Sequence, residues 1–294
     1  MGQKVSSPQE HTTAKDKEGV AHANFASLLG SSSSSPSTPA ALVDPTDLFS
    51  CTKEKEEDKA KEKEEQQQLP QHRFACLVRN VLTEEECAAL IEATERLGYD
   101  VQNPSMKHEV NRRCRLLVED PALSSLLFSR LQPFLPLRFD PTNNNNNKEE
   151  EEEEEEQEGE EEQQNRSNEY SLVGLNERLR FCRYAVGQSF SAHQDAFFKR
   201  NARERSFITC MVYLNGGFEG GATQFLEEDR TSVGESDHEA GVLCSIRPEP
   251  GLCLLFDHNL LHEGCTLLSG EKYILRTEVM YRRRGDGSQG QPVE

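Results

Sequence analysis

The sequence predicts an α+β fold in which two helices come first and a β domain follows. Three observations predict it. Two helix start signals lie before residue 132, five strand-like apolar segments lie between residues 178 and 281, and the segments outside these parts are low in complexity. Short strands at close spacing, separated by glycine and proline turns, are typical of a β barrel or sandwich.

The first helix is marked at both of its ends. A short strand is expected at residues 73–78, and after it Thr83 and Glu86 have the spacing of a capping box. An amphipathic helix is therefore expected over residues 87–97, and Gly98 ends it.

The second helix and the strands follow from the same kind of signal. Asp120 is an N-cap candidate and Pro121 suits the first helical position, so a helix is expected through about Leu131. Alternating or continuous apolar residues predict five strands, at residues 178–184, 207–214, 242–246, 252–256 and 273–281.

Low-complexity composition limits the folded part to one domain. Only 34% of the residues are hydrophobic, and the formal net charge is −19, or −7 without the twelve glutamates between residues 149 and 162. We expect a disordered tail at residues 1–69, a disordered acidic insertion at residues 141–168 and a C-terminal tail at residues 285–294. The domain then covers residues 70–284, and the tail and insertion carry no chemistry.

Composition also indicates the compartment and excludes some partners. The acidic balance argues against nucleic acid, and no apolar segment reaches the roughly 18 residues of a membrane span. The nine scattered cysteines are expected to be reduced thiols, and no secretory signal is visible, so a cytoplasmic or nuclear location is predicted. Gly2 lies in a short myristoylation pattern, which would give at most a weak membrane anchor.

The candidate chemistry lies in the β region. His193 and Asp195 are two residues apart, so on a strand both side chains would point to one side. A second histidine would complete a facial set of two imidazoles and one carboxylate, which suits Fe(II) with open coordination positions. His262 and His258 are both candidates for that histidine.

Residues 70–140 and 169–283 resemble the prolyl 4-hydroxylase-like group of 2-oxoglutarate- and Fe(II)-dependent dioxygenases. Four motifs carry the resemblance, in the order of the family: Tyr184-x-x-Gly187-x-x-Phe190-x-x-His193-x-Asp195, Tyr213-Leu-Asn-x-x-Phe218-x-Gly220-Gly221-x-Thr223-x-Phe225, Pro248-x-x-Gly251-x-x-Leu254-Leu-Phe256, and His262-Glu-Gly264 through Gly270-x-Lys272-Tyr273. The resemblance implies a double-stranded β-helix (jelly-roll) core flanked by the N-terminal helices. It also implies that His193, Asp195 and His262 bind the iron.

The resemblance further implies a 2-oxoglutarate site. Lys272 follows His262 by ten residues, the spacing of family members that bind the C5 carboxylate of 2-oxoglutarate with lysine. Arg276 lies on the same predicted strand face, so either cation could bind that carboxylate. Tyr184 and Thr223 match positions that supply hydroxyl groups to the co-substrate, and ascorbate is the reductant expected in this family.

The expected reaction is the hydroxylation of a substrate carbon, with decarboxylation of 2-oxoglutarate to succinate. A prolyl residue of a protein or peptide is the expected substrate. The loops at residues 197–205 and 227–241 are expected to border the site, and the basic residues of the first could attract an acidic peptide. Two alternatives stay open, a jelly-roll iron dioxygenase without 2-oxoglutarate and a catalytically inactive binding module of the same fold.

Overall fold

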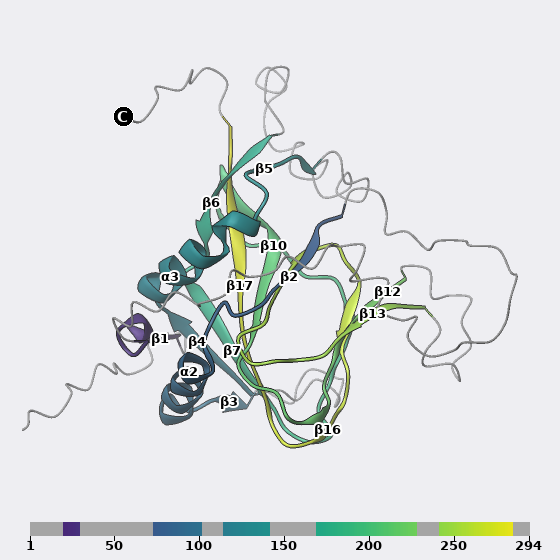
Figure 1. The fold of residues 1–294 in the computed structure, drawn as a ribbon. Coiled ribbons are helices and arrows are strands. Elements are labelled where there is room, and N and C mark those ends of the chain that lie inside the picture. Colours follow the sequence, from purple (N-terminus) through teal and green to yellow (C-terminus); the bar gives the residue numbers. More distant parts are fainter. Residues whose placement is uncertain (1–19, 30–72, 102–113, 142–168, 228–240, 285–294) are drawn as a thin grey trace, which may run out of the picture.

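The computed structural model describes residues 20–29, 73–101, 114–141, 169–227 and 241–284 (Figure 1). Within these ranges two β sheets face each other, and the helices cover the outer side of the larger sheet. The expected double-stranded β-helix core is therefore confirmed by the arrangement of the strands.

The larger sheet has eleven strands in the described part of the chain. They are β1 (Val20–His22), β2 (Ala75–Val78), β3 (Asp100–Val101), β4 (Cys114–Glu119), β5 (Arg138–Phe139), β6 (Tyr170–Leu175), β7 (Arg178–Tyr184), β9 (Lys199–Asn201), β10 (Glu204–Tyr213), β14 (Cys253–Asp257) and β17 (Lys272–Arg283). The main path through the sheet is β1-β4-β7-β17-β10-β14-β2. The long strands β10 and β17 lie side by side at its centre and form the floor on which the site is built.

The smaller sheet has the order β13-β12-β15-β8. Its strands are β8 (Phe190–His193), β12 (Thr223–Leu226), β13 (Val242–Ile246) and β15 (His262–Gly264). Strands β11 (Glu219–Gly220) and β16 (Leu267–Ser269) pair with each other in a separate two-stranded sheet. Figure 1 shows β12 and β13 across the interior from β10 and β17.

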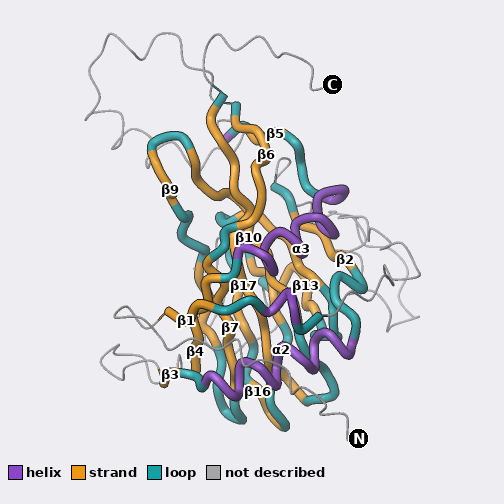
Figure 2. Tube along the Cα trace, turned by 90° about the vertical axis from the view of Figure 1, so that its left-hand side faces the viewer, coloured by secondary structure: helices purple, strands orange, loops and turns teal. Residues whose placement is uncertain are grey.

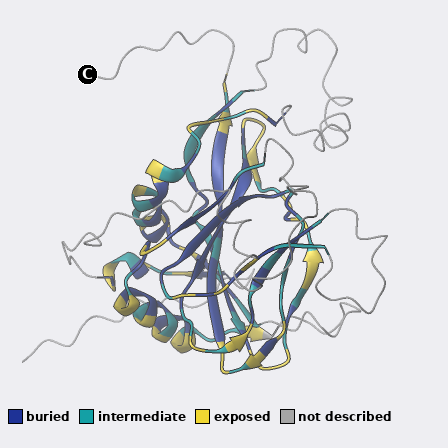
Figure 3. Cartoon of the chain, turned by 45° about the vertical axis from the view of Figure 1, so that its right-hand side comes forward, coloured by how far each residue is buried: buried dark blue, intermediate teal, exposed yellow. Residues whose placement is uncertain are grey.

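Side-chain alternation along the central strands divides the core in two. On β10, Cys210 and Val212 belong to the cluster beneath the helices, whereas Met211 and Tyr213 belong to the cluster between the two sheets. On β17, Ile274 likewise faces the interior of the sandwich. Because side chains on one face of a strand are two residues apart, Lys272 and Arg276 face that interior as well. The buried strands are dark blue at the centre of Figure 3.

Two α-helices cover the outer face of the larger sheet, as Figure 2 shows from the helix side. Helix α2 (Glu84–Leu97) begins with the expected capping box between Thr83 and Glu86, and Gly98 caps its end. Helix α3 (Pro121–Leu131) is capped by Asp120, whose carboxylate accepts from the backbone N–H of Leu123. Both helices confirm the start signals in the sequence, and the short 3-10 helix η3 (Gln132–Phe134) follows α3 directly.

The prediction that residues 1–69 form one disordered tail is wrong for residues 20–29. Strand β1 pairs in parallel with β4, and the 3-10 helix η1 (Phe25–Ser27) follows it. Phe25 is 3% exposed and packs edge-on against Phe181, with 5.7 Å between the ring centroids. Its N–H also donates to the carboxylate of Asp120. This segment therefore closes one edge of the larger sheet and joins the core.

The other low-complexity predictions lie outside the described residues. These are residues 1–19 with Gly2, residues 30–69, almost all of the insertion at 141–168, and the tail at 285–294. No helix in the described part of the chain is long and apolar enough to cross a membrane. The described cysteines are free thiols, as the sequence predicted.

Candidate metal and co-substrate site

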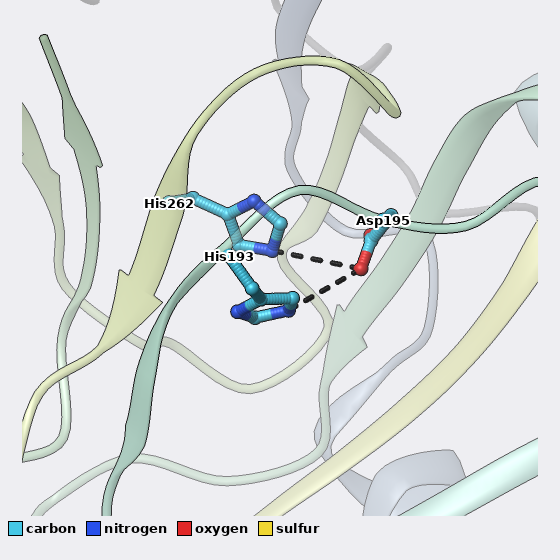
Figure 4. A group of neighbouring side chains, drawn as sticks. All are labelled: His193, Asp195 and His262. Atoms are coloured by element: carbon cyan, nitrogen blue, oxygen red, sulfur yellow. Dashed lines mark ion pairs between the residues drawn. The ribbon is translucent and has the colours of Figure 1, made fainter. Parts of the chain in front are cut away.

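The two sheets bring the three predicted metal ligands together (Figure 4). His193 ends β8 and His262 begins β15, and the antiparallel register of these strands makes the two histidines direct cross-strand partners. Their rings are 4.3 Å apart between centroids. Two histidines that are 69 residues apart in the sequence are thus neighbours on adjacent strands.

Asp195 comes to the same point from a loop. The expectation that it lies on one strand with His193 is wrong, because β8 ends at His193. The backbone N–H of Asp195 donates instead to the carbonyl of His258, at 2.8 Å. Its side chain reaches the histidines from the loop after β8, and the predicted convergence is retained without the predicted strand geometry.

The ring orientations of both histidines leave Nε2 facing the centre of the group. Nδ1 of His193 donates to the carbonyl of Ser191 and Nδ1 of His262 donates to the carbonyl of Leu260, each at 2.8 Å. Nε2 lies 3.3 Å from Oδ1 of Asp195 for His193 and 3.8 Å for His262. Metal-ligating histidines commonly donate the other ring nitrogen to a carbonyl in this way.

The electrostatics of the site favour an ionised Asp195 carboxylate beside a neutral His262 imidazole. Burial raises the pKa of Asp195, but the Arg276 guanidinium and the hydrogen bond from Thr209 outweigh it and hold the pKa well below its usual range. Burial lowers the pKa of His262 to about 4, although Asp195 opposes the shift. At neutral pH the group therefore offers the carboxylate anion of Asp195 and the uncharged imidazole of His262, and both donor types suit Fe(II).

The hydrogen bonding and the spacing of His193, Asp195 and His262 also fit a divalent metal ion. Nε2 of His193 is buried and has no hydrogen-bond partner in the described residues. A buried polar atom without a partner is costly unless something else satisfies it. The three candidate ligand atoms lie within 4.8 Å of one another, close enough for a single ion to contact all of them.

Arg276 is already engaged in this arrangement. Its Nη2 lies 2.6 Å from Oδ1 of Asp195, the oxygen that also faces both histidines. The guanidinium therefore compensates the buried carboxylate, and it is less suited to receive a co-substrate anion.

Lys272 is buried, but no carboxylate within the described part of the chain pairs with it. It is 4% exposed, donates to the carbonyl of Gly221 at 2.6 Å, and lies over the rings of Tyr184 and Tyr213. Burial lowers the pKa of Lys272 to about 8. A buried ammonium without a counter-ion is a strong attractor for an anion that enters from the cavity.

The two predicted hydroxyl residues lie near this ammonium. Tyr184 faces Lys272 across β7 and β17, and its ring lies 5.4 Å from the ammonium nitrogen. Thr223 is 3% exposed, and its hydroxyl accepts from the hydroxyl of Tyr213 at 2.7 Å, so it has its own proton to donate.

One cavity of about 310 Å³ joins all of these groups. Its volume is at the lower end of the range of small-molecule sites. The lining includes the metal-site residues, Lys272 and Arg276. It also includes aromatic and basic side chains: Arg115, Arg180, Phe190, Phe197, Phe198 and Phe256. All seven predicted site residues, Tyr184 and Thr223 included, therefore line one cavity.

The structure distinguishes the two candidates for the second histidine of the metal site, His262 and His258. His258 is buried, and its ring lies between the hydroxyls of Ser206 and Thr209 rather than toward His193. Thr209 in turn donates to Oδ2 of Asp195 at 2.5 Å. Sequence reasoning missed Ser206 and Thr209. Both lie on strand β10, and no motif in the sequence marks them as functional residues.

The first predicted loop, residues 197–205, is largely a hairpin of β9 and β10. Arg200 forms ion pairs with Glu204, at 3.1 Å, and with Glu177. The Arg205 guanidinium stacks on Phe197 with 3.9 Å to the ring centroid. These two arginines are therefore occupied, which weakens the expectation of a free basic loop. Most of the second loop, residues 228–240, lies outside the described residues.

Comparison with known proteins agrees with the geometry. Residues 179–277 match the 2OG-Fe(II) oxygenase superfamily, and this range contains every predicted ligand and co-substrate residue. Over 111 residues the chain is 29% identical to prolyl 4-hydroxylase 13 of Arabidopsis thaliana, covering 33% of this chain and 40% of that protein. Over 105 residues it is 30% identical to a PKHD-type hydroxylase of Synechococcus sp. (strain CC9605), covering 36% and 42%. The chain thus spans about two fifths of the length of these curated relatives.

Two solved structures align with most of the chain. A viral collagen prolyl hydroxylase of Paramecium Bursaria Chlorella virus-1 aligns with 72% of this chain and 97% of its own, at 18% identity and a TM-score of 0.40. A prolyl-4-hydroxylase of Pseudomonas putida aligns with 72% and 94%, at 18% identity and a TM-score of 0.42. The resemblance to prolyl 4-hydroxylase-like oxygenases that the motifs predicted is confirmed by the superfamily match and the two curated relatives.

Proposed function

We propose that this chain, whose residues 179–277 match the 2OG-Fe(II) oxygenase superfamily, is a 2-oxoglutarate- and Fe(II)-dependent dioxygenase. The observation that carries the proposal is the convergence of His193, Asp195 and His262 in one cavity with the buried ammonium of Lys272. In this role the three residues hold Fe(II). Lys272 binds the C5 carboxylate of 2-oxoglutarate.

The choice of Lys272 over Arg276 follows from their contacts. Lys272 is buried without a carboxylate partner in the described residues, whereas Arg276 pairs with Asp195. The hydroxyl of Thr223 has a proton to donate, so Tyr184 and Thr223 are proposed to complete the polar end of the cavity. A dicarboxylate bound between Lys272 and the metal site would lie in the cavity that both line.

The protein's own groups orient and shield the reacting partners. Bound Fe(II) and 2-oxoglutarate supply the oxidising chemistry, in which O₂ converts a substrate C–H to C–OH while 2-oxoglutarate becomes succinate and CO₂. The carbonyls of Ser191 and Leu260 fix the two imidazole rings. The aromatic residues Phe190 and Phe256 line the cavity and keep water from the centre.

For the substrate we propose a prolyl residue of a protein or peptide. The support is the name of the Arabidopsis relative, a prolyl 4-hydroxylase that shares 111 aligned residues with this chain. The aromatic wall formed by Phe197 and Phe198 offers an apolar surface of the kind on which a proline ring can pack. Ascorbate as a reductant and a cytoplasmic location stay predictions.

The test is a reaction of the full chain with Fe(II), 2-oxoglutarate, ascorbate and proline-rich peptides. Succinate should form together with a mass increase of one oxygen on proline. The matched control is Asp195→Ala, which should form neither product. Product formation without 2-oxoglutarate would favour an iron dioxygenase of another type, and no product with any peptide would favour an inactive module of the same fold. Hydroxylation confined to free amino acids or nucleotides would contradict the peptide assignment.

A further inference from the structure

A continuous chain of hydrogen bonds begins at Asp195 and leads through buried side chains of β10 and His258. Thr209 contacts Oδ2 of Asp195 at 2.5 Å, and Nδ1 of His258 contacts the Thr209 hydroxyl at 3.0 Å. Nε2 of His258 contacts the Ser206 hydroxyl at 2.9 Å, and Ser206 accepts from the backbone N–H of Phe198 at 2.8 Å. The chain therefore joins the candidate metal ligand Asp195 to Phe198, which lines the cavity.

Proton counting fixes the direction of every bond in this chain. The carboxylate of Asp195 can only accept, so the single hydroxyl proton of Thr209 is donated to it. The Thr209 oxygen must then accept from Nδ1–H of His258. A neutral imidazole with its proton on Nδ1 has a bare Nε2, which accepts the proton of Ser206. The Ser206 oxygen is left to accept the N–H of Phe198.

Burial keeps this arrangement in one state. Ser206 and Thr209 are fully buried, and His258 is 4% exposed. The contacts of Thr209 require a proton on Nδ1 of His258, because the single Thr209 hydroxyl proton is already donated to Asp195. The alternative tautomer would place a proton on Nε2 opposite the Ser206 hydroxyl and leave Nδ1 without a proton for Thr209. Water has no access to repair such a mismatch, so it would be costly.

We propose that His258 is a positioning residue whose Nδ1–H holds the Thr209 hydroxyl on Oδ2 of Asp195 and so leaves Oδ1 as the metal-facing oxygen. This inference rests on the proposed metal site. The contacts of the two carboxylate oxygens support it. Oδ2 accepts from Thr209, while Oδ1 pairs with Arg276 and faces Nε2 of both His193 and His262. The backbone of His258 contributes as well, since its carbonyl accepts the N–H of Asp195.

The sharpest test compares two conservative substitutions of His258. An asparagine amide can place a donor where Nδ1 lies, so His258→Asn should keep the bond to Thr209. A glutamine amide reaches the position of Nε2, so His258→Gln should keep the bond to Ser206 and lose the bond to Thr209. Loss of such an outer partner weakens metal binding about 10- to 100-fold. We therefore expect Mn(II) affinity, measured by electron paramagnetic resonance on the full chain, to fall in this range for His258→Gln and to be largely retained by His258→Asn.

A role in packing alone predicts the opposite order, because glutamine is closer to histidine in size. Thr209→Val, which keeps the shape of the side chain, should weaken Mn(II) binding as much as His258→Gln. The double variant should be no weaker than Thr209→Val, since both changes break the same chain. Ser206→Ala is the matched control at the far end, and its effect should be smaller because the Nδ1–H donor remains.

The tautomer itself can be observed in the wild-type chain by ¹⁵N NMR of the His258 ring. A proton on Nδ1 is expected, and a proton on Nε2 would overturn the inference even if every variant failed to fold. Equal Mn(II) affinity for the asparagine and glutamine variants would also overturn it while leaving the metal site intact. Failure of the wild-type chain to bind Mn(II) would instead contradict the proposed function, and the inference with it.

Discussion

Affinity for 2-oxoglutarate should fall about tenfold between pH 7 and pH 9 because of Lys272. The ammonium must be charged to bind the C5 carboxylate, and burial lowers its pKa to about 8 in the ligand-free protein. At pH 7 about nine tenths of the molecules carry the proton on Lys272, and at pH 9 about one tenth do. For an exposed lysine with its usual pKa near 10.4, affinity would hardly change over this interval.

The sign of the effect follows from proton linkage. Binding of the anion raises the pKa of Lys272, so binding takes up a proton when the free protein has lost it. Affinity is then fully present below the free pKa of about 8 and is lost progressively as the pH rises above it. The opposite trend would require a group that must lose a proton before the co-substrate binds.

Isothermal titration of 2-oxoglutarate into the Mn(II)-loaded chain, without O₂ turnover, measures this dependence directly. Lys272→Arg is the matched control, because a guanidinium stays charged throughout and should bind without the inflection near pH 8. Lys272→Met should lose binding at every pH. If Lys272→Met keeps wild-type affinity while Arg276→Met does not, Arg276 is the anchoring cation and the assignment is wrong.

Three further predictions concern stability. Lys272→Met should raise the free energy of unfolding of the ligand-free chain at pH 7 by on the order of 1 to 3 kcal/mol, because it removes a buried charge. An unchanged or lower urea midpoint would contradict this prediction. Phe25→Ala should cost about 3 to 5 kcal/mol, whereas Leu28→Ala, at a side chain that is 47% exposed, should cost under about 0.5 kcal/mol. Equal urea midpoints for these two variants would mean that residues 20–29 do not belong to the core. Gly251→Ala should cost about 3 kcal/mol or more, because the added Cβ would lie 2.0 Å from a backbone oxygen. Gly98 also has a positive φ but has open space around it, so Gly98→Ala should cost only about 1 kcal/mol. Similar losses of stability in thermal unfolding of the two variants would refute the steric argument.

Sequence reasoning predicted elements wherever a local signal exists. The capping box of Thr83 and Glu86 and the Asp120-Pro121 pair define α2 and α3, and apolar patterning defines β7 and β13 at their observed bounds. Residues 20–29 were missed because this ten-residue segment, although seven of its residues are apolar, is short and lies within low-complexity sequence. Residues 20–22 form a strand because they pair with β4, which lies about 95 residues further along the chain.

In the candidate site, too, local motifs were predictable from the sequence, whereas contacts between distant strands were not. The ligand set was predictable because the motif spacing survives in the sequence, although Asp195 reaches the centre from a loop rather than a strand. The pairing of Arg276 with Asp195 and the position of His258 behind Thr209 depend on which strands become neighbours. No pattern within one segment contains that information.

Metal titration of the full chain tests the central claim most directly. The wild-type chain should bind one Mn(II) per molecule, and His193→Ala, Asp195→Ala and His262→Ala should each abolish tight binding, while His258→Asn keeps it. Wild-type affinity in any of the three alanine variants would contradict the assignment of that residue as a ligand. Loss of binding in His258→Asn with retention in His262→Ala would show that the distal ligand is His258.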